Sequence, residues 1–197
     1  MIDIRDCTDS DGVLTIPENI SIANGTVSNA IEYSFKDFGE NAFEYDDAIK
    51  KIILPASIKS IKWGFYRCDN FTAFEVNPEN TSFCSVDGVL YSKDKKTLII
   101  YPIAHGKEYD VIEGVKKINN KAFRSSIIEK VRLPESLEYI GANAFHDCKN
   151  LKELNIPDGI IEIEPNNQNI DIDCFYKGDK YKYNELANKL RDKKILK

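Results

Sequence analysis

The stretch AFHDCKNLKELNIP, from Ala144 to Pro157, decides the fold because three other stretches of the chain repeat its pattern. They are AFEYDDAIKKIILP (42–55), GFYRCDNFTAFEVNP (64–78) and AFRSSIIEKVRLP (122–134). Each copy opens with a phenylalanine, reaches two apolar residues spaced two apart, and meets a proline within two further residues. Copies of one pattern spaced 22 to 23 residues apart indicate a repeat architecture.

The two spaced apolar residues of each copy predict a short strand, because alternate side chains of a strand point to the same face. The proline then removes an amide donor and ends the ladder. A further apolar pair follows most of these prolines, such as Leu137 and Ile140 after Pro134. A weaker copy, YDVIEGVKKI (109–118), carries Ile112 in place of the proline. One such unit is too small to bury its own apolar face, so stacked units would share a core and form one parallel sheet.

The full pattern, AF-x-x-C-x-x-L-x-x-L-x-I-P followed by I/L-x-x-I, resembles the BspA-like leucine-rich repeat family of the LRR_5 type. The resemblance covers roughly residues 39 to 163. DGVLYSKDKKTLIIYP (87–102) is similar to a hairpin insertion that recurs in the family, and residues 174–197 are similar to its closing segment. The resemblance implies that this closing segment is a strand, a glycine turn, a short helix and a last strand.

We therefore expect an α/β-type leucine-rich-repeat solenoid, a right-handed β/α superhelix of about six units built mostly from short parallel strands and loops. It would be a single domain over residues 1–197, with an irregular N-terminal repeat or cap at 1–38, repeats at 39–163 and a C-terminal cap at 164–197. The turn pair Asp87-Gly88 and the polar turn from Lys93 to Lys96 predict a β-hairpin insertion at about 79–105. A capping helix would cover the open end of the solenoid with one apolar face, formed by Tyr183, Leu186, Ala187 and Leu190.

The sequence HDC within the opening stretch has the residue types of a Cys–His nucleophile. Cys148, however, occupies the position of Cys68, Asp46 and Ser126 in the other copies, where small residues recur for packing. His146 aligns with unrelated side chains, so we expect a surface histidine beside a core cysteine and no catalytic residues. His105 is expected in a solvated turn with no obvious partner.

Other reactive groups also have a structural interpretation. The carboxylates that flank Ile163 and Ile172 would share a strand face, where they could act as acid and base or bind calcium, but solvent-facing alternation predicts the same pattern: Glu162, Glu164, Asp171 and Asp173. Glycosylation sequons occur at Asn19, Asn24, Asn70 and Asn80. A basic run near the C-terminus is expected to be a solvated helix end: Lys189, Arg191, Lys193, Lys194 and Lys197.

Composition excludes several classes of protein. The net charge is −5, without the basic face that nucleic-acid binding requires. No apolar run approaches the roughly 18 residues that span a bilayer, and the first residues carry no secretory signal. The five cysteines show no CxxC spacing, so neither a zinc site nor a disulfide framework is predicted. We expect no metal, no cofactor and no small-molecule ligand.

The candidate binding surface is the exposed, concave side of the parallel sheet, where outward residues lie between buried strand positions. Its residues are Lys51, Ile53, Ala73, Glu75, Glu108, Asp110, Lys130, Arg132, Glu153 and Asn155. The tip of the hairpin is a second candidate. The family resemblance implies a non-catalytic module that binds a host or extracellular-matrix protein at a cell surface or after secretion. The missing signal and the unpaired thiols favour instead an intracellular interaction scaffold.

Overall fold

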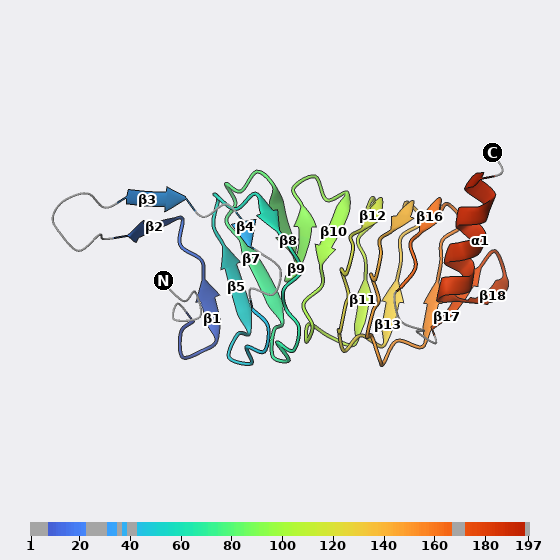
Figure 1. Cartoon of the computed structure of the whole chain (residues 1–197), viewed down its shortest axis with the longest axis horizontal. Coiled ribbons are helices and arrows are strands. Elements are labelled where there is room, and N and C mark those ends of the chain that lie inside the picture. Colours follow the sequence, from blue (N-terminus) through green and yellow to red (C-terminus); the bar gives the residue numbers. More distant parts are fainter. Residues whose placement is uncertain (1–7, 23–30, 35–36, 39–42, 167–171, 196–197) are drawn as a thin grey trace.

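The structure, a computed structural model, describes residues 8–22, 31–34, 37–38, 43–166 and 172–195. Short strands lie side by side along the long axis of the molecule, and one helix closes the C-terminal end (Figure 1). The expected leucine-rich-repeat solenoid is confirmed. In the described part of the chain that terminal helix is the only one, so turns and short strands connect the repeat units.

The first row of strands contains the copies predicted from the apolar pairs. Each strand pairs in parallel with a neighbouring unit, except at the two places described below. Buried and outward residues alternate along each strand, as in Lys130–Arg132, where only Val131 is buried. The row consists of β1 (Val13–Thr15), β5 (Lys51–Leu54), β7 (Ala73–Val76), β11 (Glu108–Asp110), β13 (Lys130–Arg132), β15 (Glu153–Asn155) and β17 (Asp173–Tyr176).

A second row of strands forms where the chain turns back after the first-row strands β5, β11, β13 and β15, and the sequence analysis did not anticipate it. These strands have two residues each, and three of them pair in parallel through Ile118, Ile140 and Ile163. They are β6 (Ser60–Ile61), β12 (Lys117–Ile118), β14 (Tyr139–Ile140) and β16 (Glu162–Ile163). Near the N-terminus, β4 (Asp37–Phe38) pairs with β6, and β2 (Asn19–Ile22) forms an antiparallel pair with β3 (Ile31–Ser34).

The predicted hairpin insertion is confirmed and contains one strand more than expected. Strands β8 (Phe83–Val86), β9 (Val89–Ser92) and β10 (Thr97–Ile100) form an antiparallel meander. The turn between β8 and β9 consists of Asp87 and Gly88, both with positive φ (48° and 80°), which is the conformation that a two-residue hairpin turn requires. Strand β10 also pairs in parallel with β12, so the meander extends the second row of strands.

Stacked aromatic rings run through the core from unit to unit. The rings of Phe43 and Phe65 stack with centroids 5.2 Å apart, and those of Phe123 and Phe145 stack at 5.0 Å. Tyr101 stacks on Phe123 at 4.9 Å and therefore takes the phenylalanine position of its own unit. The weak copy at 109–118 is the second half of this unit, and its predicted register is confirmed by Tyr109 lying opposite Val131. The sequence analysis did not extend the copy back to Tyr101, because tyrosine replaces the phenylalanine that marks the other copies.

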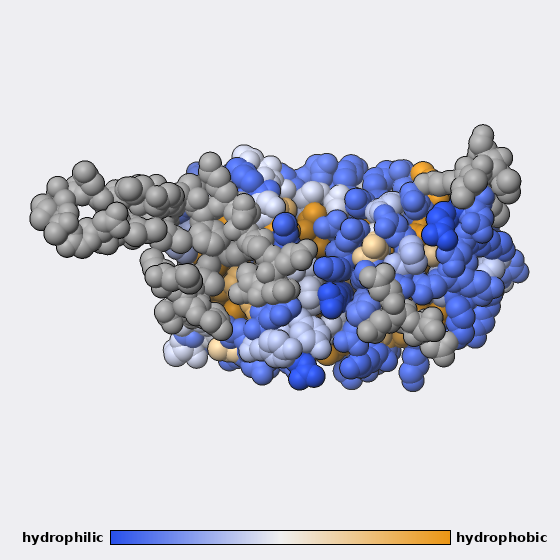
Figure 2. All heavy atoms as spheres, in the orientation of Figure 1, coloured by the Kyte–Doolittle hydropathy of each residue, from blue (hydrophilic) through white to orange (hydrophobic). Residues whose placement is uncertain are grey.

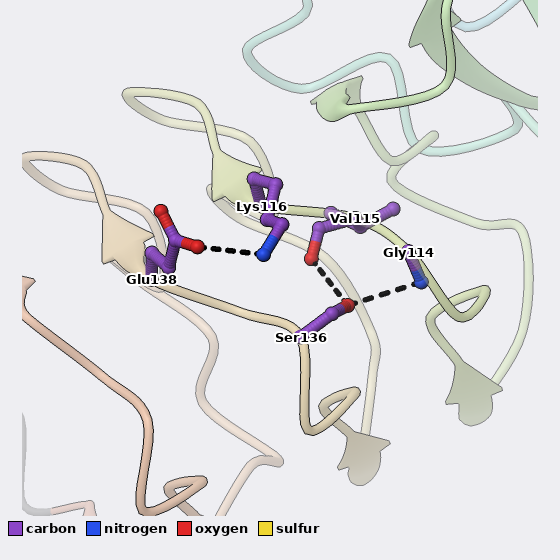
Figure 3. Close-up of polar contacts among 5 residues, drawn as sticks. All are labelled: Gly114, Val115, Lys116, Ser136 and Glu138. Carbon is purple, nitrogen blue, oxygen red and sulfur yellow. Dashed lines mark hydrogen bonds and ion pairs between the residues drawn. The ribbon is translucent and has the colours of Figure 1, made fainter.

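Polar side chains hold consecutive turns together. Ser136 donates a hydrogen bond to the carbonyl of Val115 (2.8 Å) and accepts one from the amide of Gly114 (3.0 Å) (Figure 3). Lys116 and Glu138 of the same two units form an ion pair at 2.6 Å (Figure 3). The two hydrogen bonds of Ser136 pair backbone groups that the short strands leave without partners.

The C-terminal cap follows the expected elements in a different order. Strand β17 turns at Gly178 into β18 (Asp179–Lys182), and α1 (Tyr183–Ile195) follows. The last strand therefore precedes the helix, because the chain after Gly178 pairs directly with β17. The apolar face predicted for the helix is confirmed by four buried side chains: Tyr183, Leu186, Ala187 and Leu190.

Candidate functional site

The outward residues of the first row of strands form a surface that we call the strand face. The strand register brings them side by side, with Ile53 opposite Glu75 and Asp110 opposite Arg132. The ten residues predicted for this site fall on this row: Lys51, Ile53, Ala73, Glu75, Glu108, Asp110, Lys130, Arg132, Glu153 and Asn155.

Ion pairs between neighbouring strands fix several of these side chains. Lys51 contacts Glu75 at 2.7 Å, and Arg132 contacts Asp110 at 2.5 Å and Glu108 at 3.9 Å. All these groups are exposed, so each pair contributes only about 0–1 kcal/mol to stability. The ion pairs orient the charges of the strand face without burying them.

The meander interrupts the strand face between β7 and β11. The amide of Phe74 in β7 donates to the carbonyl of Gly88 (2.8 Å), so the Asp87-Gly88 turn lies against β7 where the next repeat strand would pair. A Cβ atom on Gly88 would lie 3.0 Å from that of Ala73. The predicted row therefore consists of two patches, and Ala73 is partly covered by the turn.

The strand face continues onto the C-terminal cap, which the sequence analysis missed. Asp173 and Phe175 of β17 lie opposite Glu153 and Asn155, and β18 adds Lys180 and Lys182. Asp173 accepts from Lys180 (2.6 Å) and Lys182 (2.8 Å), and these bonds lower the pKa of its carboxyl group. The period-two alternation of residues 173–176 could have revealed this extension.

The surface is hollowed between β13 and β15, within the larger patch of the strand face. We call this feature the β13–β15 hollow; its volume is about 700 Å³. The two strands belong to neighbouring units but to different hydrogen-bonded sheets, so no ladder closes the space between them. The hollow is lined by Glu129, Lys130, Val131, Arg132, Lys149, Asn150, Lys152, Glu153 and Asn155.

Cys148 is a core residue, as expected. It is 2% exposed, and its thiol donates to the carbonyl of Phe123 at 2.9 Å, as the thiol of Cys68 does to Phe43 at 2.6 Å. Burial raises the pKa of Cys148 to about 12, so the reactive thiolate is strongly disfavoured.

His146 does not occupy the exposed, unconstrained position that the alignment of copies predicted. Its side chain is half-buried, and Nδ1 is buried without a hydrogen-bond partner. The guanidinium group of Arg124, in the preceding repeat, lies over the ring of Trp63, 4.4 Å from the centroid. Burial and then the charge of Arg124 lower the pKa of His146.

His105 has the partners that its sequence context did not suggest. Its Nδ1 lies 2.8 Å from the carbonyl oxygen of Thr72, and its ring packs edge-on against Tyr101 and Tyr109. The hydroxyl groups of Tyr91 and Tyr109 share a buried hydrogen bond of 2.8 Å beside it. His105 therefore links the unit that begins at Tyr101 to the repeat that precedes the meander.

The remaining sequence candidates have structural partners or lie outside the described residues. Glu164 accepts a hydrogen bond from Tyr139, while Asp171 lies outside the described residues. Asn80 is fully buried and donates to the carbonyls of Pro55 (2.8 Å) and Ile58 (3.0 Å), so its sequon is inaccessible to a glycan.

Asn70 donates to the carbonyl of Asp47, whereas Asn24 and the side chain of Asn19 lie outside the described residues. Among the residues that the structure describes, no group of three histidine, cysteine or acidic side chains could hold a metal ion. In the same residues, no helix has both the length and the apolar character needed to cross a membrane.

The solenoid and its strand face define a leucine-rich-repeat module, a class that in general binds proteins and is generally non-catalytic. The model for the BspA type leucine rich repeat region matches six copies, over residues 13–87 and 116–192. The chain therefore belongs to the BspA-type leucine-rich repeat family. The unmatched segment contains most of the meander and the unit that begins at Tyr101.

A solved bacterial structure shares the fold. A leucine-rich repeat protein from Eubacterium ventriosum is 24% identical with a TM-score of 0.60, and the alignment covers 72% of this chain and 40% of that one. A leucine-rich cell surface protein from Faecalibacterium prausnitzii is 23% identical (TM-score 0.49; 80% and 50% covered).

The pneumococcal vaccine antigen PcpA is 26% identical (TM-score 0.44; 68% and 46% covered). The chain thus spans at most half the length of these three proteins. A search of curated proteins found no match.

Proposed function

We propose that this chain is a non-catalytic interaction module that binds a partner protein through the strand face. The observation that carries the proposal is the row of outward, ion-paired side chains whose backbone register is fixed by the solenoid. Such a rigid, polar surface presents its charges in a fixed order, which favours specific recognition of a complementary partner. The described surface visible in Figure 2 is mostly hydrophilic. The outward residues of the strand face are mostly charged, so charge complementarity rather than an apolar anchor would select the partner.

We also propose, more specifically, that the chain belongs to a surface or secreted protein that adheres to a host or extracellular-matrix protein, as the family suggests. A second proposal, an intracellular interaction scaffold, is supported by the thiols, because Cys68, Cys84, Cys148 and Cys174 are all unpaired. Fractionation of the native cells, with an antibody against the chain, would separate these two proposals. Detection of the chain at the cell surface supports the first proposal, and detection in the cytosol alone supports the second.

A binding screen against immobilised extracellular-matrix proteins and glycans tests the function. For a captured partner, we expect charge reversal on the strand face, by Glu75→Arg or by Asp110→Arg with Arg132→Glu, to weaken binding at least tenfold. Glu79→Arg is the matched control, since Glu79 is exposed on the turn after β7 and lies off the strand face. Unchanged binding in all strand-face variants would contradict the proposed surface.

A further inference from the structure

Backbone amides at the β13–β15 hollow lack the hydrogen bonds that join the other units. In the preceding unit the amides of Glu129 and Lys130 donate to the carbonyl of Lys107, at 2.6 and 2.9 Å. In the following unit Asp173 donates to the carbonyl of Lys152 at 2.9 Å. The equivalent amides of Lys152 and Glu153 make no such bond to Glu129 in the described part of the chain. Two donors therefore remain available at this edge of β15.

Unpaired positive charge surrounds the same hollow. Four of its nine lining residues are basic and two are acidic. Glu129 is already bound to Lys107 at 2.8 Å, and Arg132 is held by Asp110. Lys130 and Lys152 form no ion pair within the described residues. Lys149 is bound to Asp147 at 3.5 Å, and Glu153 forms no ion pair within the described residues, so the unpaired lining charges are two lysines and one carboxylate. The hollow therefore keeps a net positive charge in a chain whose net charge is −5.

Ammonium groups combined with free backbone amides are the groups that bind carboxylates in proteins. Asn150 and Asn155 add neutral donors to the lining of the hollow. Apolar ligands are disfavoured, because Val131 is its only apolar lining residue and is buried in the strand.

From the free amides, the unpaired lysines and the shape of the hollow, we propose that the β13–β15 hollow binds the carboxylates of an acidic segment of a partner protein. This inference rests on the proposed function and names the partner chemistry at one place on the strand face. Lys130 and Lys152 would pair with the carboxylate oxygens, and the amides of Lys152 and Glu153 would donate to them.

The probe is a fluorescein-labelled hexaglutamate peptide, with hexaglutamine as the neutral control, titrated with the full chain and followed by fluorescence anisotropy. We expect saturable binding of hexaglutamate alone, weakened by added salt. The double variant Lys130→Gln/Lys152→Gln should bind at least tenfold more weakly. The double variant Lys62→Gln/Lys95→Gln changes the charge equally at exposed lysines outside the hollow and should bind as the parent does.

A second measurement locates the contact without a variant. In ¹⁵N–¹H spectra of the full chain, hexaglutamate should shift the amide signals of Lys152 and Glu153 more than those of Lys116 and Lys117, whose amides donate to the carbonyl of Lys96. Equal losses in the two double variants, or shifts spread over the whole chain, would overturn the inference, because net charge alone would then attract the peptide. Binding of a sulfated oligosaccharide but not of hexaglutamate would also overturn it.

The two proposals can fail separately. If a captured protein binds through the strand face but tolerates Lys130→Gln/Lys152→Gln, the function stands and the acidic-segment inference is wrong. The opposite outcome is that hexaglutamate binds in the hollow as expected while the captured protein binds every strand-face variant as tightly as the parent. In that case the inference stands and the proposed function of the strand face is wrong.

Discussion

At the residue scale, the position of Cys148 in its repeat explains its chemistry. The position takes a small side chain in each copy, and the thiol is buried against the preceding turn of the solenoid. Because the raised pKa disfavours the thiolate and the core excludes reagents, we expect Cys148 to react with iodoacetamide at pH 8 roughly a hundredfold more slowly in the folded chain than in guanidinium. Peptide mass spectrometry measures this rate at the single cysteine. Fast alkylation of Cys148 in the folded chain would revive the nucleophile hypothesis.

The protonation of His146 makes the stability of the folded chain depend on pH. Its folded pKa lies below the ordinary value of 6.5, first because of burial and then because of the charge of Arg124. The unfolded chain therefore binds the proton more readily, and stability is complete above about pH 6.5 and decreases as the pH falls from there towards the folded pKa. Asp147 acts in the opposite direction and raises the pKa, but burial, Arg124 and Lys121 together outweigh it.

We expect the free energy of unfolding in urea to decrease between pH 7 and pH 5.5, and His146→Gln to reduce this dependence. Most carboxyl groups titrate below that range, so the difference between the two chains isolates the histidine. An identical pH dependence in both chains would show that His146 is solvated, as the alignment of copies predicted.

The two histidines show what repeat alignment can and cannot predict. Alignment placed the inward residues correctly, because packing imposes the same side-chain size on each copy. It failed for His146, and the sequence context failed for His105, because their surroundings come from outside their own repeat. Arg124, whose charge lowers the pKa of His146, belongs to the preceding repeat, and the Thr72 carbonyl that lies 2.8 Å from His105 belongs to the repeat before the meander.

At the element scale, the Asp87-Gly88 turn joins the meander to the first row of strands. A side chain at Gly88 would suffer both a positive φ and a Cβ contact of 3.0 Å with Ala73. Gly88→Ala should therefore cost about 2–4 kcal/mol of stability, of which the left-handed backbone alone accounts for about 1–2 kcal/mol.

Gly178→Ala is the matched control, since Gly178 has φ 85° but nothing within 4 Å of a new Cβ. Gly178→Ala should lose only the part of the stability that the left-handed backbone accounts for. Urea unfolding of both variants measures the difference, and equal losses would show that the turn does not press against Ala73.

The predictability of the elements depends on whether they leave a repeated pattern. First-row strands such as β5, β13 and β15 were predicted because their alternation and the following proline recur from copy to copy, whereas β8, which has four residues but belongs to no repeat, was not. The strands of the second row, such as Tyr139–Ile140, have two residues each and are too short for any period. The outward residues of the strand face were predictable because the same alternation assigns them to the solvent side of each strand. The β13–β15 hollow was not, because it depends on hydrogen bonds that Lys152 and Glu153 fail to make.

At the scale of the whole molecule, the meander divides the core in two. Val89, Tyr91 and Leu98 pack in a cluster that extends to the C-terminal helix, whereas Leu90 and Ile100 pack in the N-terminal cluster with Phe43 and Phe65. The faces of β9 and β10 thus belong to different cores. The single domain that we propose would consist of two apolar cores on either side of one small sheet.

This division predicts how damage spreads from the C-terminal end. In a solenoid each unit contacts only its neighbours, so a lost cap weakens nearby units first. Leu186 is fully buried between the helix and the last unit, and Leu186→Ala should cost about 2–5 kcal/mol. Hydrogen exchange followed by mass spectrometry should then accelerate over β13–β17 and remain unchanged over β1–β7.

The matched variant Leu14→Ala, which truncates a fully buried leucine of the N-terminal cluster, should reverse the pattern. Uniform acceleration in either variant would show that the two cores unfold together, because the meander would then transmit the loss instead of confining it.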